Sequence, residues 1–164
     1  MQRWYISFHG GDEDRVWNNI HIYDLNGAPL GKALDTHSLP EGLELRELRG
    51  FTFGPTGDLY VANAYKDASQ VLRFSGIPGD NGKHAFKEIF AEQHKTNPGL
   101  AHPFDVTFGP DGHLYVPSQD TNIVGRVLGE VPERDTVYLT VLALAVAAVA
   151  VSMVVRRTRF GLAL

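Results

Sequence analysis

Short runs of alternating apolar and polar residues recur along the first 130 positions of the chain. In the clearest stretch, Pro55 and Gly57 mark a tight turn between two runs, because proline presets φ and glycine takes a positive φ. Runs of this length with alternate apolar residues are typical of half-buried strands. The pattern predicts four antiparallel strands joined as a meander, at 51–53, 59–63, 70–74 and 85–90.

The same pattern returns at a fixed distance. The phrase Phe-Gly-Pro-Thr-Gly-Asp-Leu-Tyr-Val at 53–61 is matched by Phe-Gly-Pro-Asp-Gly-His-Leu-Tyr-Val at 108–116, and the same offset leads back to Trp-Tyr-Ile at 4–6. Such a period is the signature of a repeat architecture, in which each unit buries its apolar face against a neighbour. We expect further strands in the first and third units, at 3–8, 18–23, 30–34, 104–108, 113–117 and 123–127.

Four-stranded antiparallel meanders that repeat along a chain form the blades of a β-propeller. The sequence therefore predicts an all-β fold, an incomplete β-propeller of about 2.5 four-stranded antiparallel blades, with units at about 1–45, 46–100 and 101–130. The first unit lacks its opening strand, and a ring needs at least about four blades. We expect the chain to be a fragment of a longer reading frame or a fusion, with unpaired blade edges that invite self-association.

The C-terminal part has a different pattern. Residues 137–155 contain no charge, glycine or proline, and as a helix they would span about 28 Å, close to the hydrocarbon thickness of a bilayer. We expect a linker at 131–136, one transmembrane α-helix at 137–155 and a basic tail at 156–164; a buried core helix is the alternative. The positive-inside rule puts this tail in the cytoplasm and the propeller outside, as a single-pass membrane protein, although the first residues carry no export signal.

Composition and charge exclude some kinds of site and one class of partner. The chain has no cysteine, which excludes a disulfide framework, a thiolate zinc site and a cysteine nucleophile. Residues 1–134 hold 12 Lys and Arg against 18 Asp and Glu, and no basic stripe runs through them. Nucleic acid is therefore not an expected partner.

The phrase at 108–116, with its match at 53–61, resembles the repeat of NHL-type and gluconolactonase-like six-bladed β-propellers. The resemblance covers about 3–128 and implies the fold, whereas the activities of such propellers range from lactonases and lyases to plain scaffolds. Gluconolactonase-like proteins place a metal ligand near the end of the second strand. The resemblance puts Asn63 at that position in the second unit and Ser118 in the third, and no N-terminal glutamate ligand aligns.

Two family resemblances compete for the C-terminal segment. Val-Pro-Glu at 131–133, followed by an apolar helix and arginines, is similar to the PEP-CTERM surface-sorting tail of Gram-negative bacteria. Arg-Phe-Gly-Leu-Ala-Leu at 159–164, after a spanning helix, is similar to a segment of branched-chain amino-acid ABC permeases. Both imply one helix with its basic end inside.

Polar residues gather in the loops that a propeller would bring to one end of its channel, which is where ligand sites of such folds lie. The candidate ligand-binding residues are Arg49, Asn63, Tyr65, His102, Asp105, Gln119 and Asp120, with His9, Asp12, Asp14, Arg46, Glu47 and Asp67 in the same loops. The alternative is that these residues are solvated loop and turn-capping residues.

No catalytic motif occurs in the chain: there is no Gly-x-Ser-x-Gly elbow, no phosphate loop and no histidine pair at metal-ligand spacing on a helix. We therefore predict a membrane-anchored module that binds a small molecule or a protein through its propeller loops, with no evident cofactor or metal and no evident reaction. The alternative is a lactonase-like, metal-assisted hydrolase with calcium or zinc at the channel mouth. For the tail, the alternative is a fragment of an ABC transporter permease.

Overall fold

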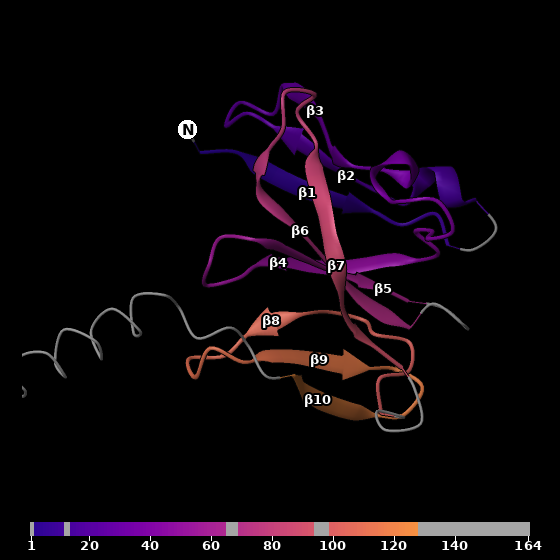
Figure 1. The fold of residues 1–164 in the computed structure, drawn as a ribbon. Helices are drawn as coiled ribbons and strands as arrows, with labels where there is room; N and C mark the ends of the chain where they lie inside the picture. The colour runs from indigo at the N-terminus through magenta and orange to yellow at the C-terminus, as the bar shows by residue number, and fades with distance from the viewer. Residues whose placement is uncertain (1, 12–13, 65–68, 94–98, 128–164) are drawn as a thin grey trace, which may run out of the picture. The chain divides into compact units, whose positions relative to one another are not determined.

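The computed structural model describes residues 2–11, 14–64, 69–93 and 99–127, which belong to one compact unit spanning 1–130. The described residues form an all-β fold of antiparallel sheets with two short 3-10 turns and no α-helix (Figure 1). The predicted transmembrane helix at 137–155 and its basic tail lie outside these residues. Among the residues that are described, no helix is long and apolar enough to cross a membrane.

The middle sheet is the four-stranded meander that the sequence predicts for the second unit. Its strands run in the order β4 (Leu48–Phe53), β5 (Leu59–Asn63), β6 (Gln70–Pro78) and β7 (His84–Glu92), each antiparallel to the next. The third and fourth strands are longer than predicted, because β6 and β7 continue their pairing to Pro78 and His84, with register shifts on the way.

A three-stranded meander flanks the middle sheet on each side. The first sheet contains β1 (Trp4–Phe8), β2 (Asn19–Tyr23) and β3 (Pro29–Leu34), and the 3-10 turns η1 (Arg15–Trp17) and η2 (Thr36–Ser38) lie in its connections. The third sheet contains β8 (Thr107–Phe108), β9 (Leu114–Ser118) and β10 (Ile123–Val127). Successive meanders of this kind give the described residues a propeller-like arrangement.

The opening strand of the third sheet is shorter than the predicted 104–108. Only Thr107 and Phe108 pair with β9 as a ladder, and Pro103 forms an isolated bridge to Ser118. Between them the Phe104 carbonyl accepts a hydrogen bond from the Gly50 N–H of the middle sheet. The Phe104 N–H donates to the Pro117 carbonyl of β9, so this stretch bonds to both sheets.

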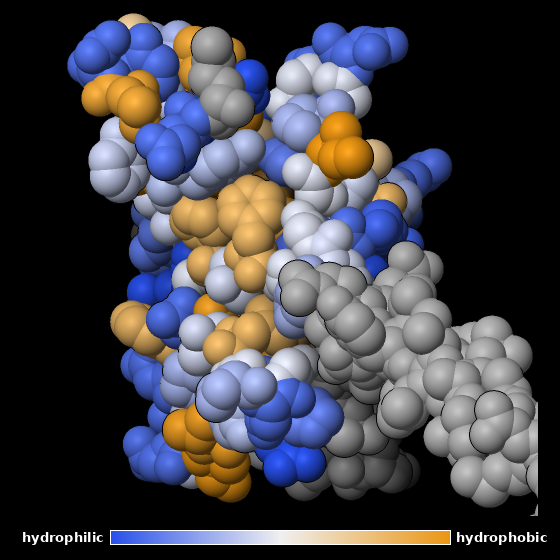
Figure 2. Space-filling model, turned by 90° about the vertical axis from the view of Figure 1, so that its left-hand side faces the viewer, coloured by the Kyte–Doolittle hydropathy of each residue, from blue (hydrophilic) through white to orange (hydrophobic). Residues whose placement is uncertain are grey.

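Two apolar layers hold the three sheets together. Between the first and middle sheets the buried residues include Ile20, Leu34 and Phe74; between the middle and third sheets they include Tyr60 and Val116. Burial of such side chains stabilises a fold by roughly 1.5–3 kcal/mol each. Figure 2 shows apolar side chains gathered in a band on the side where the β4–β5 and β8–β9 turns lie.

The repeated phrase builds the same hairpin twice. Gly57 and Gly112 have φ values of 86° and 75°, and each closes a turn whose backbone bonds are the same in both copies. Gly54 and Gly109 are glycine for another reason: a Cβ atom on either would lie 2.6 Å from the ring of Tyr60 or Tyr115. The phrase thus encodes a turn and a place for the tyrosine ring.

Candidate functional site

Loop residues of all three sheets meet around the segment that leads into β4. Two buried asparagines hold the backbone of this segment. Asn63 accepts a hydrogen bond from the Arg46 N–H and donates one to the Glu44 carbonyl, both at 2.9 Å. Asn18 donates to the Arg46 carbonyl at 2.9 Å and accepts from the Leu48 N–H at 3.3 Å. Residue 47, between these anchors, is therefore held in place by its neighbours.

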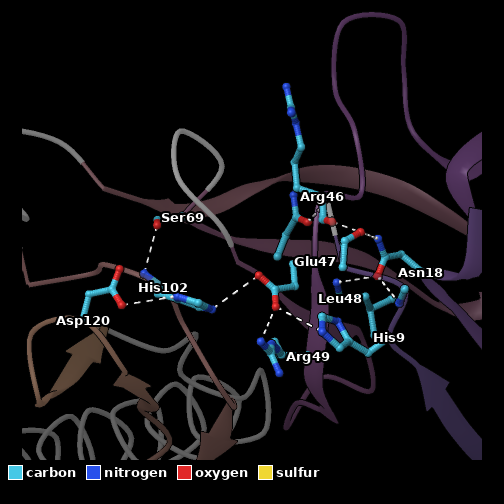
Figure 3. Close-up of polar contacts among 12 residues, drawn as sticks. His9, Asn18, Arg46, Glu47, Leu48, Arg49, Ser69, His102 and Asp120 are labelled. Atoms are coloured by element: carbon cyan, nitrogen blue, oxygen red, sulfur yellow. Dashed lines mark hydrogen bonds and ion pairs between the residues drawn. The ribbon is translucent and has the colours of Figure 1, made fainter. Parts of the chain in front are cut away.

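The side chain of Glu47 is the centre of the site (Figure 3). It is only 6% exposed, and groups from three sheets contact it. His9, which follows β1, places Nε2 at 3.1 Å from Oε1, and the Arg49 guanidinium of β4 contacts the same oxygen. His102, which precedes β8, places Nε2 at 3.4 Å from Oε2. One buried carboxylate thus links all three sheets.

His102 extends the network into the third sheet. Its Nδ1 lies 3.3 Å from Oδ1 of Asp120, in the turn after β9, and its backbone N–H donates to the Ser69 hydroxyl at 3.0 Å. His102 has a φ of 54°, in the left-handed region that few residues other than glycine adopt. The contacts of His102 with Ser69, Asp120 and Glu47 offset the unfavourable free energy of this backbone conformation.

Burial lowers the pKa of His9, and the Arg49 guanidinium lowers it further, against the Glu47 carboxylate and a backbone hydrogen bond with Leu48 that raise it. His9 is therefore neutral at neutral pH. A histidine whose folded pKa lies below its unfolded value takes up a proton more readily in the unfolded chain. Acidification from about pH 6.5 downward consequently removes stability at this position.

Two buried charged atoms of the site have no hydrogen-bond partner among the described residues. They are Oε2 of Glu47, whose 3.4 Å contact with His102 Nε2 is not a hydrogen bond, and Nε of Arg49, an acceptor and a donor. Buried polar atoms are rarely left without a partner, and an exception calls for an explanation such as a water or a ligand. The Arg49 guanidinium also lies 5.4 Å from the ring centroid of Phe104, a side chain that is half exposed.

Of the predicted ligand-binding residues, the structure brings Arg49, His102 and Asp120 together. Gln119 is adjacent, because its backbone N–H donates to the His102 carbonyl at 3.0 Å. Asp105 is exposed and accepts from the Val106 N–H, outside the Glu47 contacts.

Of the two remaining predicted residues, Asn63 is described and Tyr65 is not. Asn63 is fully buried and its amide is committed to the backbone around Arg46. Tyr65 lies outside the described residues, as do Asp12 and Asp67.

The sequence indicates Glu47 and His9 only as members of the wider set of loop residues, and it does not indicate Ser69 or Phe104 as site residues. The structure puts all four in contact with the core of the site. No spacing in the sequence marks them, since they come from different repeat units. Among the described residues, no group of three or more His, Asp or Glu side chains is arranged to hold a metal ion.

Comparisons with known proteins give weak likenesses. No family model matches the chain, and no curated protein matches it. A chain in a crystal structure of a mitotic checkpoint complex matches with a TM-score of 0.47 and 15% identity, over 74% of this chain and 31% of that chain. A putative oxidoreductase (glucose dehydrogenase) from Thermus thermophilus matches with a TM-score of 0.43 and 19% identity, over 79% and 38%. The chain thus spans about a third of the length of each, and likenesses at this level carry no information on activity.

Proposed function

We propose that this chain is a binding module that takes a small polyhydroxylated solute at the Glu47–Arg49 pair. The observation that supports the proposal is the unfilled hydrogen-bonding capacity of this buried pair, at the point where loops of three sheets converge. A hydroxyl group donates and accepts at once, so one hydroxyl can donate to Oε2 of Glu47 and accept from Nε of Arg49. Hydrogen bonds to charged groups are the stronger kind.

The surroundings of the pair fit such a solute. Phe104 is 51% exposed and presents an apolar ring beside Arg49, against which the C–H face of a sugar ring can pack. Asp120 and His9 offer polar groups that are still partly exposed. A few polar groups that converge beside an apolar surface are the usual composition of a small-molecule site.

Calorimetric titration of the full chain with D-glucose, D-gluconate and glycerol tests the proposal. We expect binding of at least one probe, and a loss of about 10- to 100-fold in affinity for Glu47→Gln, because a charge-assisted hydrogen bond contributes about 1.5–3 kcal/mol. Glu44→Gln is the matched control, since Glu44 is an acid at the same end whose side chain is 53% exposed. Unfolding curves of both variants show whether they fold.

If no probe binds, or if Glu47→Gln binds as the wild type does, the proposed function is wrong. A catalytic role for the histidines finds less support. His9 already contacts Glu47 and the Leu48 backbone, and His102 lies between the Glu47 and Asp120 carboxylates, so each imidazole already faces polar groups of the protein. The metal-assisted hydrolase stays an untested alternative, for which titration with calcium and zinc is the direct experiment.

The proposal includes anchoring to a membrane through 137–155, with the binding module outside. Its support is the sequence alone: the uncharged run and the arginines after it. We expect the full chain to stay with membranes during alkaline carbonate extraction, and a protease outside the cell to cleave the β-sheet domain but not the C-terminal tail. Release by carbonate would show that no spanning helix forms.

A further inference from the structure

Each sheet of this protein presents two different faces, and the side of a residue follows from its place in the repeat. In β5, Leu59 and Val61 face the first sheet, whereas Tyr60 and Ala62 face the third. The same alternation runs through β1 and β9, because successive residues of a strand point to opposite sides. A sheet thus has one face for the unit before it and another for the unit after it.

The two interfaces inside the chain are built alike. At the first, the Tyr5 ring meets Phe53 edge to face, with centroids 5.2 Å apart and planes at 77°. At the second, Tyr60 meets Phe108 at 5.0 Å and 73°. Both are the contact of a tyrosine in one unit with the phenylalanine that opens the hairpin of the next. The chain therefore repeats one interface, with the same two kinds of face.

Among the described residues, nothing covers one face of the first sheet and one face of the third sheet. On the first sheet, Trp4, Ile6 and Phe8 are 59%, 46% and 38% exposed, on the side away from the middle sheet. On the third sheet, Val124 is 63% exposed and lies opposite Pro117 in the ladder. Bare apolar faces on neighbouring residues mark a site of protein association.

The uncovered face of the third sheet contains a hollow that can accept side chains of a partner. It has a volume of about 390 Å³, and Phe104, Pro117 and Val124 are among the residues that line it. At the interface within the chain, the matching positions are filled. Ala62 and Val71 occupy the positions in the middle sheet that correspond to Pro117 and Val124, and both are fully buried in the cluster that contains Val116.

The repeat identifies what would fill the hollow. Ile6 of the first sheet occupies the repeat position of Val116, and Val124 of the third sheet occupies the ladder position of Val71. Val71 and Val116 lie in the same buried cluster. The bare faces of the first and third sheets are therefore the two halves of the interface that the chain already forms internally.

We propose that the partner of these faces is a second copy of this chain. The third sheet of each copy docks on the first sheet of the other, so that two copies place six sheets around one two-fold axis, a number within the range of closed propellers. The first sheet cannot dock on the third sheet of its own chain, because the middle sheet stands between them. In this arrangement the copies associate through sheet faces, whereas the sequence predicts association through strand edges.

The full chain in a mild detergent, analysed by sedimentation equilibrium, tests this proposal. We expect a protein mass of twice the 18.1 kDa of one chain, stable over a range of concentrations. Ile6→Lys and Val124→Glu should each give monomers, because each buries an unpaired charge in both copies of the interface. Both residues are exposed in one chain, so the substitutions should leave the fold intact, which circular dichroism checks.

The double variant makes the test specific. Ile6→Lys together with Val124→Glu places opposite charges across each interface, and we expect it to restore the dimer. A dimer that Val124→Glu leaves intact would mean that first sheets pair with each other, and it would overturn the proposal. Monomers at every concentration would overturn it too, as would a mass that keeps rising with concentration, since that indicates open chains of copies.

Cross-linking gives an independent readout, because the chain has no cysteine of its own. An Ile6→Cys chain mixed with a Val124→Cys chain should form a disulfide-linked pair on mild oxidation, and Trp17→Cys with Val124→Cys should not. Trp17 is also exposed but lies in η1, outside the strand β1 that carries Ile6. Equal yields from the two mixtures would contradict the head-to-tail arrangement.

Discussion

The strands β5 and β9 share the sequence Leu-Tyr-Val and lie in different surroundings. Every residue of β5 is buried, because sheets pack on both of its faces. In β9, buried residues alternate with partly exposed ones, because the middle sheet covers only one face. Tyr60 is 1% exposed and its ring meets Phe90 and Phe108, whereas Tyr115 is partly exposed and donates a hydrogen bond to Asp111.

The comparison shows that the repeat determines which way a side chain points. The neighbouring sheet determines how much that side chain contributes to the free energy of unfolding. A tyrosine over a glycine is encoded identically in both hairpins. Of the two tyrosines, only Tyr60 is removed from water and packs against other aromatic rings. Matched substitutions in the two copies therefore measure what a covering sheet contributes to the free energy of unfolding.

The largest difference is expected for the two tyrosines. Tyr60→Ala should destabilise the domain by about 4 kcal/mol, because it opens a cavity between the middle and third sheets. Tyr115→Ala should cost less than about 1 kcal/mol in the monomer, since its ring is partly in water. Urea unfolding of both variants under conditions that keep the chain monomeric measures the difference. Equal costs would mean that the third sheet does not pack on the middle sheet.

The next difference concerns the residue after each turn glycine. Asp58 is nearly buried and its carboxylate contacts Arg73 at 2.6 Å and Lys87 at 2.7 Å, whereas the matching His113 is partly exposed. We expect Asp58→Ala to lower the free energy of unfolding by about 3 kcal/mol, because it removes the carboxylate that balances nearly buried Arg73. His113→Ala should change it by less than about 0.5 kcal/mol. Urea unfolding of the two variants gives both values.

The contribution of Asp58 to the free energy of unfolding depends on pH, and it decreases in acid. Burial alone would raise the pKa of Asp58, but hydrogen bonds from Lys87, Arg73 and the Gly76 N–H outweigh it, so the pKa lies below its ordinary value. The contribution of Asp58 is thus present above the unfolded pKa, near 3.8, and is lost as the pH falls through the lower folded value. Asp58→Asn should remove this part of the acid dependence, and an unchanged acid limb in unfolding curves would contradict it.

The smallest difference is expected at the ends of the two strands. Asn63 bonds to the backbone at Arg46 and Glu44, so Asn63→Ala should cost about 2 kcal/mol by leaving buried backbone groups without partners. The hydroxyl of Ser118 is buried without a hydrogen-bond partner among the described residues. Ser118→Ala should therefore be neutral or slightly stabilising, as thermal unfolding can show. A clear loss at Ser118 would indicate that its hydroxyl binds a partner such as a ligand.

The strands were largely predictable, because alternation and the turn glycines are local signals. Leu59–Asn63 and Ile123–Val127 match the predicted ranges, and the other strands differ mainly at their ends. The predicted strand 104–108 is too long, because only Thr107 and Phe108 form β8 and the Phe104 carbonyl bonds to Gly50 of another sheet, a contact that no local pattern encodes. For the candidate site, the sequence names Arg49, His102 and Asp120, which the structure brings together, but it does not indicate the central place of Glu47.

The sequence by itself determined the hairpins, the period and the direction of each side chain, because turn chemistry and strand alternation act over a few residues. Only the tertiary structure decided that Glu47 is buried between His9 and His102, since these residues are distant in sequence and belong to three different sheets. It likewise decided that Tyr60 is buried and Tyr115 is not. Burial depends on what packs against a face, and two phrases that share seven of nine residues do not by themselves specify two different neighbours.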